Sequence, residues 1–167
     1  MKKSILLVLI FTCSYVFAQD DISSKNSWFK AGITAGVPIG DTADVSSFNL
    51  GLDFRGQYLV NPNFAIGVAS GYNHFFGKDG ADDFGIIPLA GFLRYYFSAE
   101  GLFVGTDIGY GFLTNVDNNE GGLLLSPHIG YHNYNWNFYV YYQRTSTDAS
   151  FDVESIGIGA KYNLRFK

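Results

Sequence analysis

Residues 153–167 read VESIGIGAKYNLRFK, and the alternation within this stretch decides the fold. Every second residue between positions 156 and 166 is apolar, whereas the residues between them are glycine, lysine, asparagine and arginine. Successive side chains of a β-strand point to opposite faces, so this segment has one apolar face and one polar face. The apolar face points inward in a water-soluble protein and outward in a barrel that spans a membrane. The direction of this face therefore determines the class of protein.

The same alternation recurs in seven earlier segments, which are separated by residues typical of turns. No segment has a convincing period of 3.6 residues, so the sequence predicts an all-β protein. The strands are expected at residues 28–39, 48–60, 64–75, 84–97, 102–112, 123–132, 136–144 and 155–166.

The connections between these strands alternate in length. Those at residues 61–63, 98–101 and 133–135 are tight, and those at 40–47, 76–83, 113–122 and 145–154 are long. Most acidic residues lie in the long connections: Asp41, Asp44, Asp79, Asp82, Asp83, Asp117, Glu120, Asp148, Asp152 and Glu154. Short turns at one rim and longer loops at the other are typical of membrane barrels. We therefore predict an eight-stranded antiparallel up-and-down transmembrane β-barrel over residues 28–167.

Three features of the strands favour an outward apolar face. The aromatic residues of this face gather near the strand ends, as in the interfacial girdles of membrane barrels. Glycine is common on the other face, which suits the crowded interior of a small barrel. A strand of about 11 residues, tilted near 45°, covers the height of about 25 Å that lipid requires. The alternative is a soluble, lipocalin-like secreted barrel with the apolar set inside, which would bind a ligand there.

The N-terminus predicts export. Lys2 and Lys3 precede an apolar run, and a small-residue cleavage site ends at Ala18, so residues 1–18 are expected to be a cleaved signal peptide. Residues 19–27 form a polar lead-in to the barrel. The remaining chain has no cysteine, because Cys13 lies in the signal, so packing and strand pairing must stabilise the fold. The net charge of −4 argues against a nucleic-acid partner.

The polar face carries charged residues. If this face lines the lumen, these residues need partners of opposite charge or hydrogen-bonding groups there. Pairing Phe97 with Leu102 across a tight turn puts Arg94 diagonally from Asp107. Pairing Phe112 with Leu123 puts Asp107 opposite His128. Because the loop between these strands is long, a register shifted by two residues is also possible. The lumenal polar cluster predicted in this way, with a structural role, comprises Arg94, Asp107, His128, Tyr141, Asp53, Arg55, Lys161 and Arg165.

Catalytic and metal sites are less favoured interpretations of these residues. Ser126, His128 and Asp107 are the residue types that hydrolysis uses, but residues two apart on a strand are separated by about 6.6 Å. His128 and His132 would lie about 13 Å apart, too far to share a metal ion. The acidic stretch at 78–83 lacks the full pattern of a calcium-binding loop. We expect no enzyme activity, metal or cofactor.

The segments IIPLAGFLRYYF (86–97), FAQ (17–19) and AKYNLRF (160–166) carry a family resemblance. The chain resembles the small eight-stranded outer-membrane barrels of Gram-negative bacteria, the OmpA/OmpX-like outer membrane protein beta-barrel domain, especially members from Bacteroidetes. The resemblance implies a monomer in the cell outer membrane, in contact with outer-membrane lipid, with a structural or surface-interaction role. It also implies that Tyr162, Leu164 and Phe166 form the C-terminal signal read by the outer-membrane insertion machinery. Such barrels also include enzymes that modify lipid A, which is the second possibility.

Overall fold

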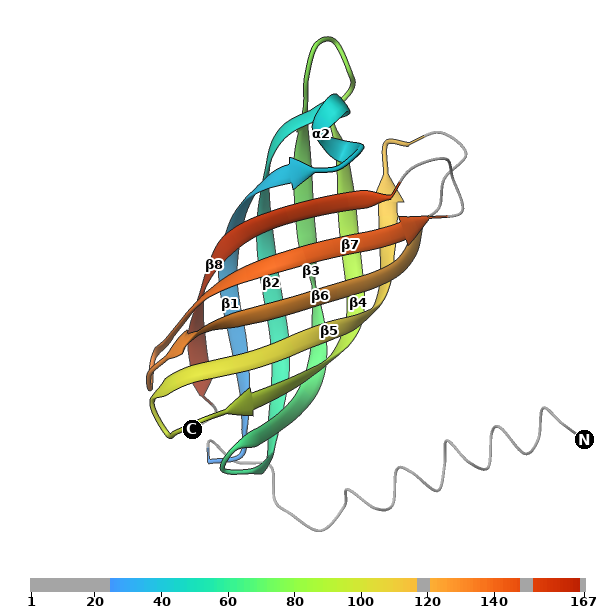
Figure 1. The fold of residues 1–167 in the computed structure, drawn as a ribbon. Helices are drawn as coiled ribbons and strands as arrows, with labels where there is room; N and C mark the ends of the chain where they lie inside the picture. Colours follow the sequence, from blue (N-terminus) through green and yellow to red (C-terminus); the bar gives the residue numbers. More distant parts are fainter. Residues whose placement is uncertain (1–24, 117–120, 148–151, 166–167) are drawn as a thin grey trace, which may run out of the picture.

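The structure is a computed structural model that describes residues 25–116, 121–147 and 152–165. Within these ranges, eight strands form a closed barrel in chain order, and β8 pairs with β1 to close it (Figure 1). Every neighbouring pair is antiparallel. The strands are β1 (Ser27–Ile39), β2 (Ser46–Asn61), β3 (Phe64–Gly77), β4 (Phe84–Tyr96), β5 (Gly101–Thr114), β6 (Gly121–His132), β7 (Trp136–Thr147) and β8 (Val153–Arg165). The predicted up-and-down barrel is confirmed.

One short helix, α2 (Thr42–Val45), interrupts the connection between β1 and β2 and was not expected. Its turn is built by hydrogen bonds from Ala43 N to Gly40 O and from Asp44 N to Asp41 O. Four residues are too few to show a helical period, which explains why the sequence gives no sign of it. No helix in the described ranges is long and apolar enough to cross a membrane.

Several strands extend further toward the long loops than the alternation predicts. β5 continues to Thr114, β6 begins at Gly121 and β7 continues to Thr147. Gly121 and Gly122 still pair with β5, although neither has a side chain that could mark a face. The prediction relied on alternating side chains, whereas strand pairing needs only the backbone.

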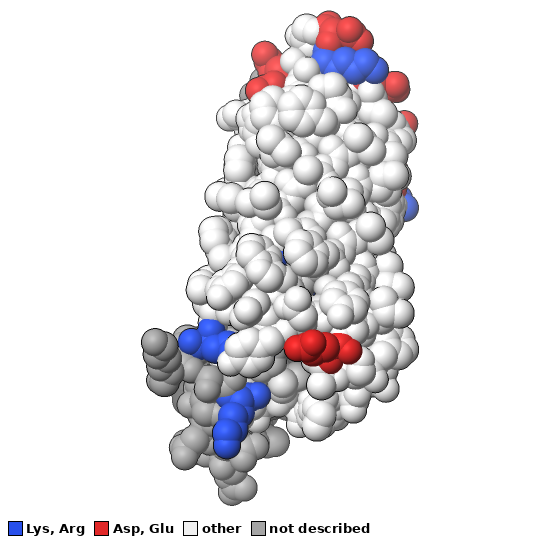
Figure 2. All heavy atoms as spheres, turned by 90° about the vertical axis from the view of Figure 1, so that its left-hand side faces the viewer, with Lys and Arg blue, Asp and Glu red and all other residues white. Residues whose placement is uncertain are grey.

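The two faces of the sheet differ in the direction expected for a membrane barrel. The apolar residues Ile33, Val68 and Ile158 are each more than 60% exposed on the outside. The charged residues Lys30 and Lys161 are 1% and 0% exposed in the lumen. Figure 2 shows a broad, nearly charge-free band between charged groups at the two ends of the molecule. The apolar face therefore points outward, as predicted.

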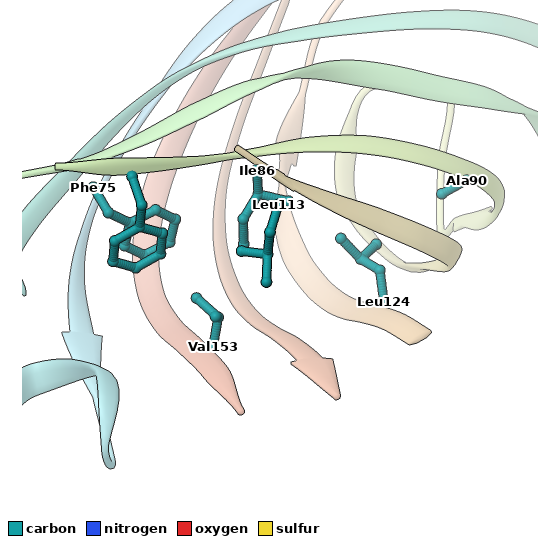
Figure 3. Packing of buried hydrophobic residues seen from close by; sticks show 7 residues of the cluster. Phe75, Ile86, Ala90, Leu113, Leu124 and Val153 are labelled. Carbon is teal, nitrogen blue, oxygen red and sulfur yellow. The ribbon is translucent and has the colours of Figure 1, made fainter. Parts of the chain in front are cut away.

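The lumen also contains an apolar cluster near the long loops. Phe75, Phe84 and Ile86 contribute from β3 and β4, and the rings of Phe75 and Phe84 stack with centroids 4.8 Å apart. Leu124 of β6 and Val153 of β8 belong to the same cluster (Figure 3). These side chains fill much of the loop end of the lumen, beside the buried polar residues Asn49 and Thr145, which pair with Phe75 and Val153.

Candidate functional site in the lumen

The lumenal ion pairs centre on Arg55 of β2. Its guanidinium binds both carboxylate oxygens of Asp107 on β5, each at 2.6 Å. It also donates to Asp53 on its own strand, from Nε at 2.9 Å and from Nη2 at 3.0 Å. Two-point contacts between arginine and carboxylate are among the stronger hydrogen bonds in proteins. Arg55 thereby joins β2 to β5 across the lumen.

Asp53 gathers donors from three strands. Besides Arg55, it accepts from Lys161 Nζ of β8 at 2.8 Å and from the Tyr139 hydroxyl of β7 at 3.0 Å. Lys161 Nζ also lies 3.9 Å from the ring centroid of Tyr139, a cation–π contact. The cost of burying Asp53 and the two cations is therefore offset by direct pairing.

A second group of cations lies closer to the short turns. Lys30 Nζ and Arg94 Nη1 both donate to the Asn137 side-chain oxygen, at 2.9 Å and 3.0 Å. Arg94 also lies over the ring of Phe103, with 4.3 Å between the guanidinium carbon and the ring centroid. Among the described residues, no carboxylate forms an ion pair with Lys30 or Arg94. Their positive charges are held by a neutral amide and by aromatic faces.

His128 connects the two groups weakly. Its Nδ1 lies 3.1 Å from the backbone oxygen of Ser126 and 3.9 Å from Asp107, and its Nε2 lies 3.4 Å from Arg94. Nδ1–H donating to the carbonyl and Nε2 accepting from Arg94 fit a neutral imidazole. His128 thus bonds the Ser126 main chain and leaves the serine hydroxyl without the base that nucleophilic catalysis would need.

The register between β5 and β6 differs from the one chosen from the sequence. Phe112 pairs with Gly121 in place of Leu123, so Asp107 lies opposite Ser126, and His128 lies opposite Gly105. The shift is the two-residue alternative that the long loop left open. Its physical reason is that the ladder continues through two glycines at the start of β6.

The remaining predicted residues lie apart from these groups. Tyr141 faces His128 across the ladder, but its hydroxyl accepts from Asn49 of β2 at 3.3 Å. Arg165 lies at the short-turn end, where it donates to the Tyr134 backbone oxygen at 3.2 Å and covers the Trp28 ring. Tyr162 and Leu164 are exposed on the outer face, and Phe166 lies outside the described residues.

Sequence reasoning did not assign roles to the neutral residues that complete the network. Asn137 binds both unpaired cations and also donates to Asn163 at 2.8 Å. The Tyr96 hydroxyl donates to Gln57 at 2.8 Å and accepts from Lys30 at 3.3 Å. The inward parity of these residues was the available signal, but parity does not tell how far an amide reaches across the lumen.

The lumen leaves little free space between the ion pairs and the apolar cluster. A cavity of about 40 Å³ lies beside Asp53, Arg55 and Asp107. No group of three His, Cys, Asp or Glu residues that could hold a metal ion occurs in the described ranges. In the described part of the chain, the arrangement is a network of mutually bonded side chains that joins strands across the lumen.

One further cluster lies outside the barrel wall, at the loop between β3 and β4. Asp83 accepts from Gly77 N at 2.7 Å and lies 3.0 Å from His74 Nε2. The hydrogen bond from Gly77, and after it the one from His74, lowers the pKa of the Asp83 carboxyl below its usual value. Tyr72 lies 3.2 Å from the other nitrogen of the same imidazole. These contacts fold the loop back onto the end of β3.

Comparison with protein-family models and with curated proteins found no match. Solved structures do share the fold. Ail, the attachment invasion locus protein of Yersinia pestis, aligns with a TM-score of 0.61 at 13% identity, over 83% of this chain and 98% of that one. Neisserial surface protein A aligns with a TM-score of 0.61 at 13% identity, over 84% and 97%. A de novo designed transmembrane β-barrel aligns with a TM-score of 0.54 at 17% identity, over 86% and 100%. The chain thus has the architecture of small membrane barrels.

Proposed function

We propose that the chain is an integral outer-membrane barrel with a structural or surface-interaction role. The observation that carries this proposal is the belt of exposed apolar side chains around a lumen that holds the buried charged residues. An apolar surface that surrounds the molecule would be very unfavourable in water and is stable against lipid. The outer face also has an apolar hollow of about 770 Å³, where Ala35 and Ala160 leave room between larger neighbours for lipid chains.

The interior supports a closed barrel in preference to a channel. Eight strands leave an interior only wide enough for side chains. The ion pairs of Asp53, Arg55 and Asp107, together with the apolar cluster at the loop end, occupy that interior. The proposed role therefore lies in the outer surface and the loops, and a solute pathway or a catalytic role is not part of it.

The acidic loops are the proposed surface for interaction. Asp41, Asp44, Asp79 and Asp82 lie in the described parts of the long connections, where charged residues crown the upper end in Figure 2. Asp117, Glu120 and Asp148 lie outside the described residues. Outer-membrane barrels carry their longer loops on the extracellular side, so these acids would face the cell exterior.

Assembly would follow the route of other barrels of this kind. Tyr162 and Leu164 point outward at the end of β8, in the pattern of the C-terminal segment that the insertion machinery reads, and Phe166 would complete it. The proposed partners are thus outer-membrane lipid and that machinery, with a monomer as the final state. Residues 1–18, outside the described residues, would supply the export signal.

Membrane fractionation with and without Ile108→Arg tests the location. Ile108 is 52% exposed on the outer face near the middle of β5, and arginine facing lipid at mid-bilayer costs about 2–4 kcal/mol. We expect the unaltered chain to migrate faster before boiling than after it, and Ile108→Arg to lose this compact band. Asp82→Arg, on an exposed loop, is the matched control and should retain it. Normal membrane assembly of Ile108→Arg would contradict the proposed outward face.

A further inference from the structure

The short-turn end of the barrel contains a vestibule of about 550 Å³, which has no role in the proposed function. Its volume lies in the range of small-molecule sites. The vestibule is lined by Lys25, Trp28, Lys30, Tyr96, Glu100 and Arg165, among others. Three cations and two aromatic rings therefore face a common space, with Glu100 exposed at its rim.

Lys30 and its neighbour Arg94 have no carboxylate partner among the described residues. Both lumenal carboxylates, Asp53 and Asp107, are engaged by Arg55 and Lys161. Lys30 and Arg94 converge on one neutral oxygen, that of Asn137, and each is only 1% exposed. Two buried cations that share a neutral acceptor repel each other, and a nearby anion would offset that repulsion.

Two buried donors near Lys30 lack an acceptor within the described ranges. Trp28 Nε1 and Gln57 Nε2 have no hydrogen-bond acceptor among the described residues, and the two side chains are 6% and 3% exposed. They lie on paired positions of β1 and β2. Lys30 Nζ lies 5.6 Å from the Trp28 ring centroid, and Gln57 is joined to Lys30 through the Tyr96 hydroxyl. An acceptor is the partner that these donors lack, because a buried N–H without one is costly.

We propose that this vestibule binds an oxyanion of the phosphate class, with Lys30 as its principal ligand. A phosphate group presents several acceptor oxygens, which matches two donors that lie two residues apart on β1 and line the vestibule, Lys30 Nζ and Trp28 Nε1. The aromatic walls fit a phosphate ester better than the bare ion. In the proposed membrane orientation the site opens to the periplasm, but binding itself requires only a folded barrel.

Titration of inorganic phosphate into the full folded barrel, in a phosphate-free neutral detergent at constant ionic strength, tests the proposal. Trp136→Phe removes the second of the two tryptophans, so that fluorescence reports on Trp28 alone. We expect a saturable change that is weakened about tenfold or more by Lys30→Met, the size expected for losing a charge-assisted contact. Lys78→Met, which removes an exposed cation at the opposite end, is the matched control and should bind phosphate as before.

A second variant separates binding from folding. Equilibrium dialysis with radiolabelled phosphate should show weakened binding for Trp28→Phe, which keeps the aromatic wall and removes the N–H donor. Doping the micelles with phosphatidylglycerol distinguishes the sources: competition identifies a lipid headgroup as the occupant, and its absence identifies a soluble phosphate. The proposal is overturned if folded Lys30→Met binds as Lys78→Met does, or if binding does not saturate. Loss of the membrane location alone would contradict only the proposed function.

Discussion

Replacing Asp53 by asparagine should destabilise the barrel more than any exposed carboxylate replacement. Asp53 accepts hydrogen bonds from Arg55, Lys161 and Tyr139, all within the lumen. Asparagine has nearly the same size, but it is neutral and presents an N–H group to some of these donors. Lys161, which is 0% exposed, would then have no carboxylate partner among the described residues.

The expected loss in free energy of unfolding follows from the charged partners of Asp53 that stay buried in the variant. Breaking a buried ion pair by removing one member typically costs about 3–5 kcal/mol, because the other charge stays buried. The Asp53 side chain is 14% exposed, and Arg55 keeps its contact with Asp107, so we expect the lower end, about 3 kcal/mol. Removing the stranded cation as well, in Asp53→Asn/Lys161→Met, should recover at least about 1 kcal/mol.

Urea unfolding of the barrel in lipid vesicles, followed by tryptophan fluorescence, measures these free energies. Asp82→Asn is the matched control, since it makes the same chemical change on an exposed loop and should cost less than about 0.5 kcal/mol. The reasoning is refuted if Asp53→Asn and Asp82→Asn unfold at the same urea concentration. A double variant that is as unstable as the sum of its single variants would also refute it.

Three further outcomes are expected. Ile158→Arg, which puts a charge on a residue 63% exposed to lipid, should lower the free energy of unfolding by about 2–4 kcal/mol in the same urea titration, and an unchanged midpoint would contradict the outward face. Gly67→Val should abolish the compact unboiled band in electrophoresis, because a Cβ at Gly67 would lie 2.0 Å from a backbone oxygen and 2.6 Å from the Phe92 ring; a normal band would show that this packing is looser than described. The contacts that lower the pKa of Asp83 also stabilise its loop. This stabilisation is fully present above the ordinary carboxyl pKa of about 3.9 and is lost as the pH falls through the lowered pKa. The chemical shift of the Gly77 amide, followed by NMR, should therefore titrate with a midpoint below about 3.9, and a midpoint at or above that value would contradict the contact.

The alternating pattern predicted the strands well because it constrains every position. In β8, Ile158 and Lys161 must lie on opposite faces whatever the rest of the barrel does. Tight turns then set the pairing between neighbours, and Arg94 pairs with Gly105, as the turn after β4 requires. Position within a strand and the register across short turns are local properties, which explains their agreement with the structure.

The parts that could not be predicted depend on distances across the lumen. The long loop after β5 gives no local constraint, and the register of Asp107 was therefore wrong by two residues. The meeting of Arg55 with Asp107 at 2.6 Å joins strands three apart, so it depends on the curvature of the closed barrel. The apolar cluster around Ile86 was missed because its members sit on the face that the alternation assigns to polar residues and glycine.

Quenching of tryptophan by brominated lipid tests most directly whether the apolar face contacts the membrane. In a chain carrying Trp28→Phe and Trp136→Phe, a single tryptophan would be placed either by Ile158→Trp on the outer face or by Phe103→Trp in the lumen. Ile158 is 63% exposed and Phe103 is 0% exposed. Strong quenching of Ile158→Trp with little quenching of Phe103→Trp is the expected result. Equal quenching of the two, or stronger quenching at position 103, would contradict an outward-facing apolar belt.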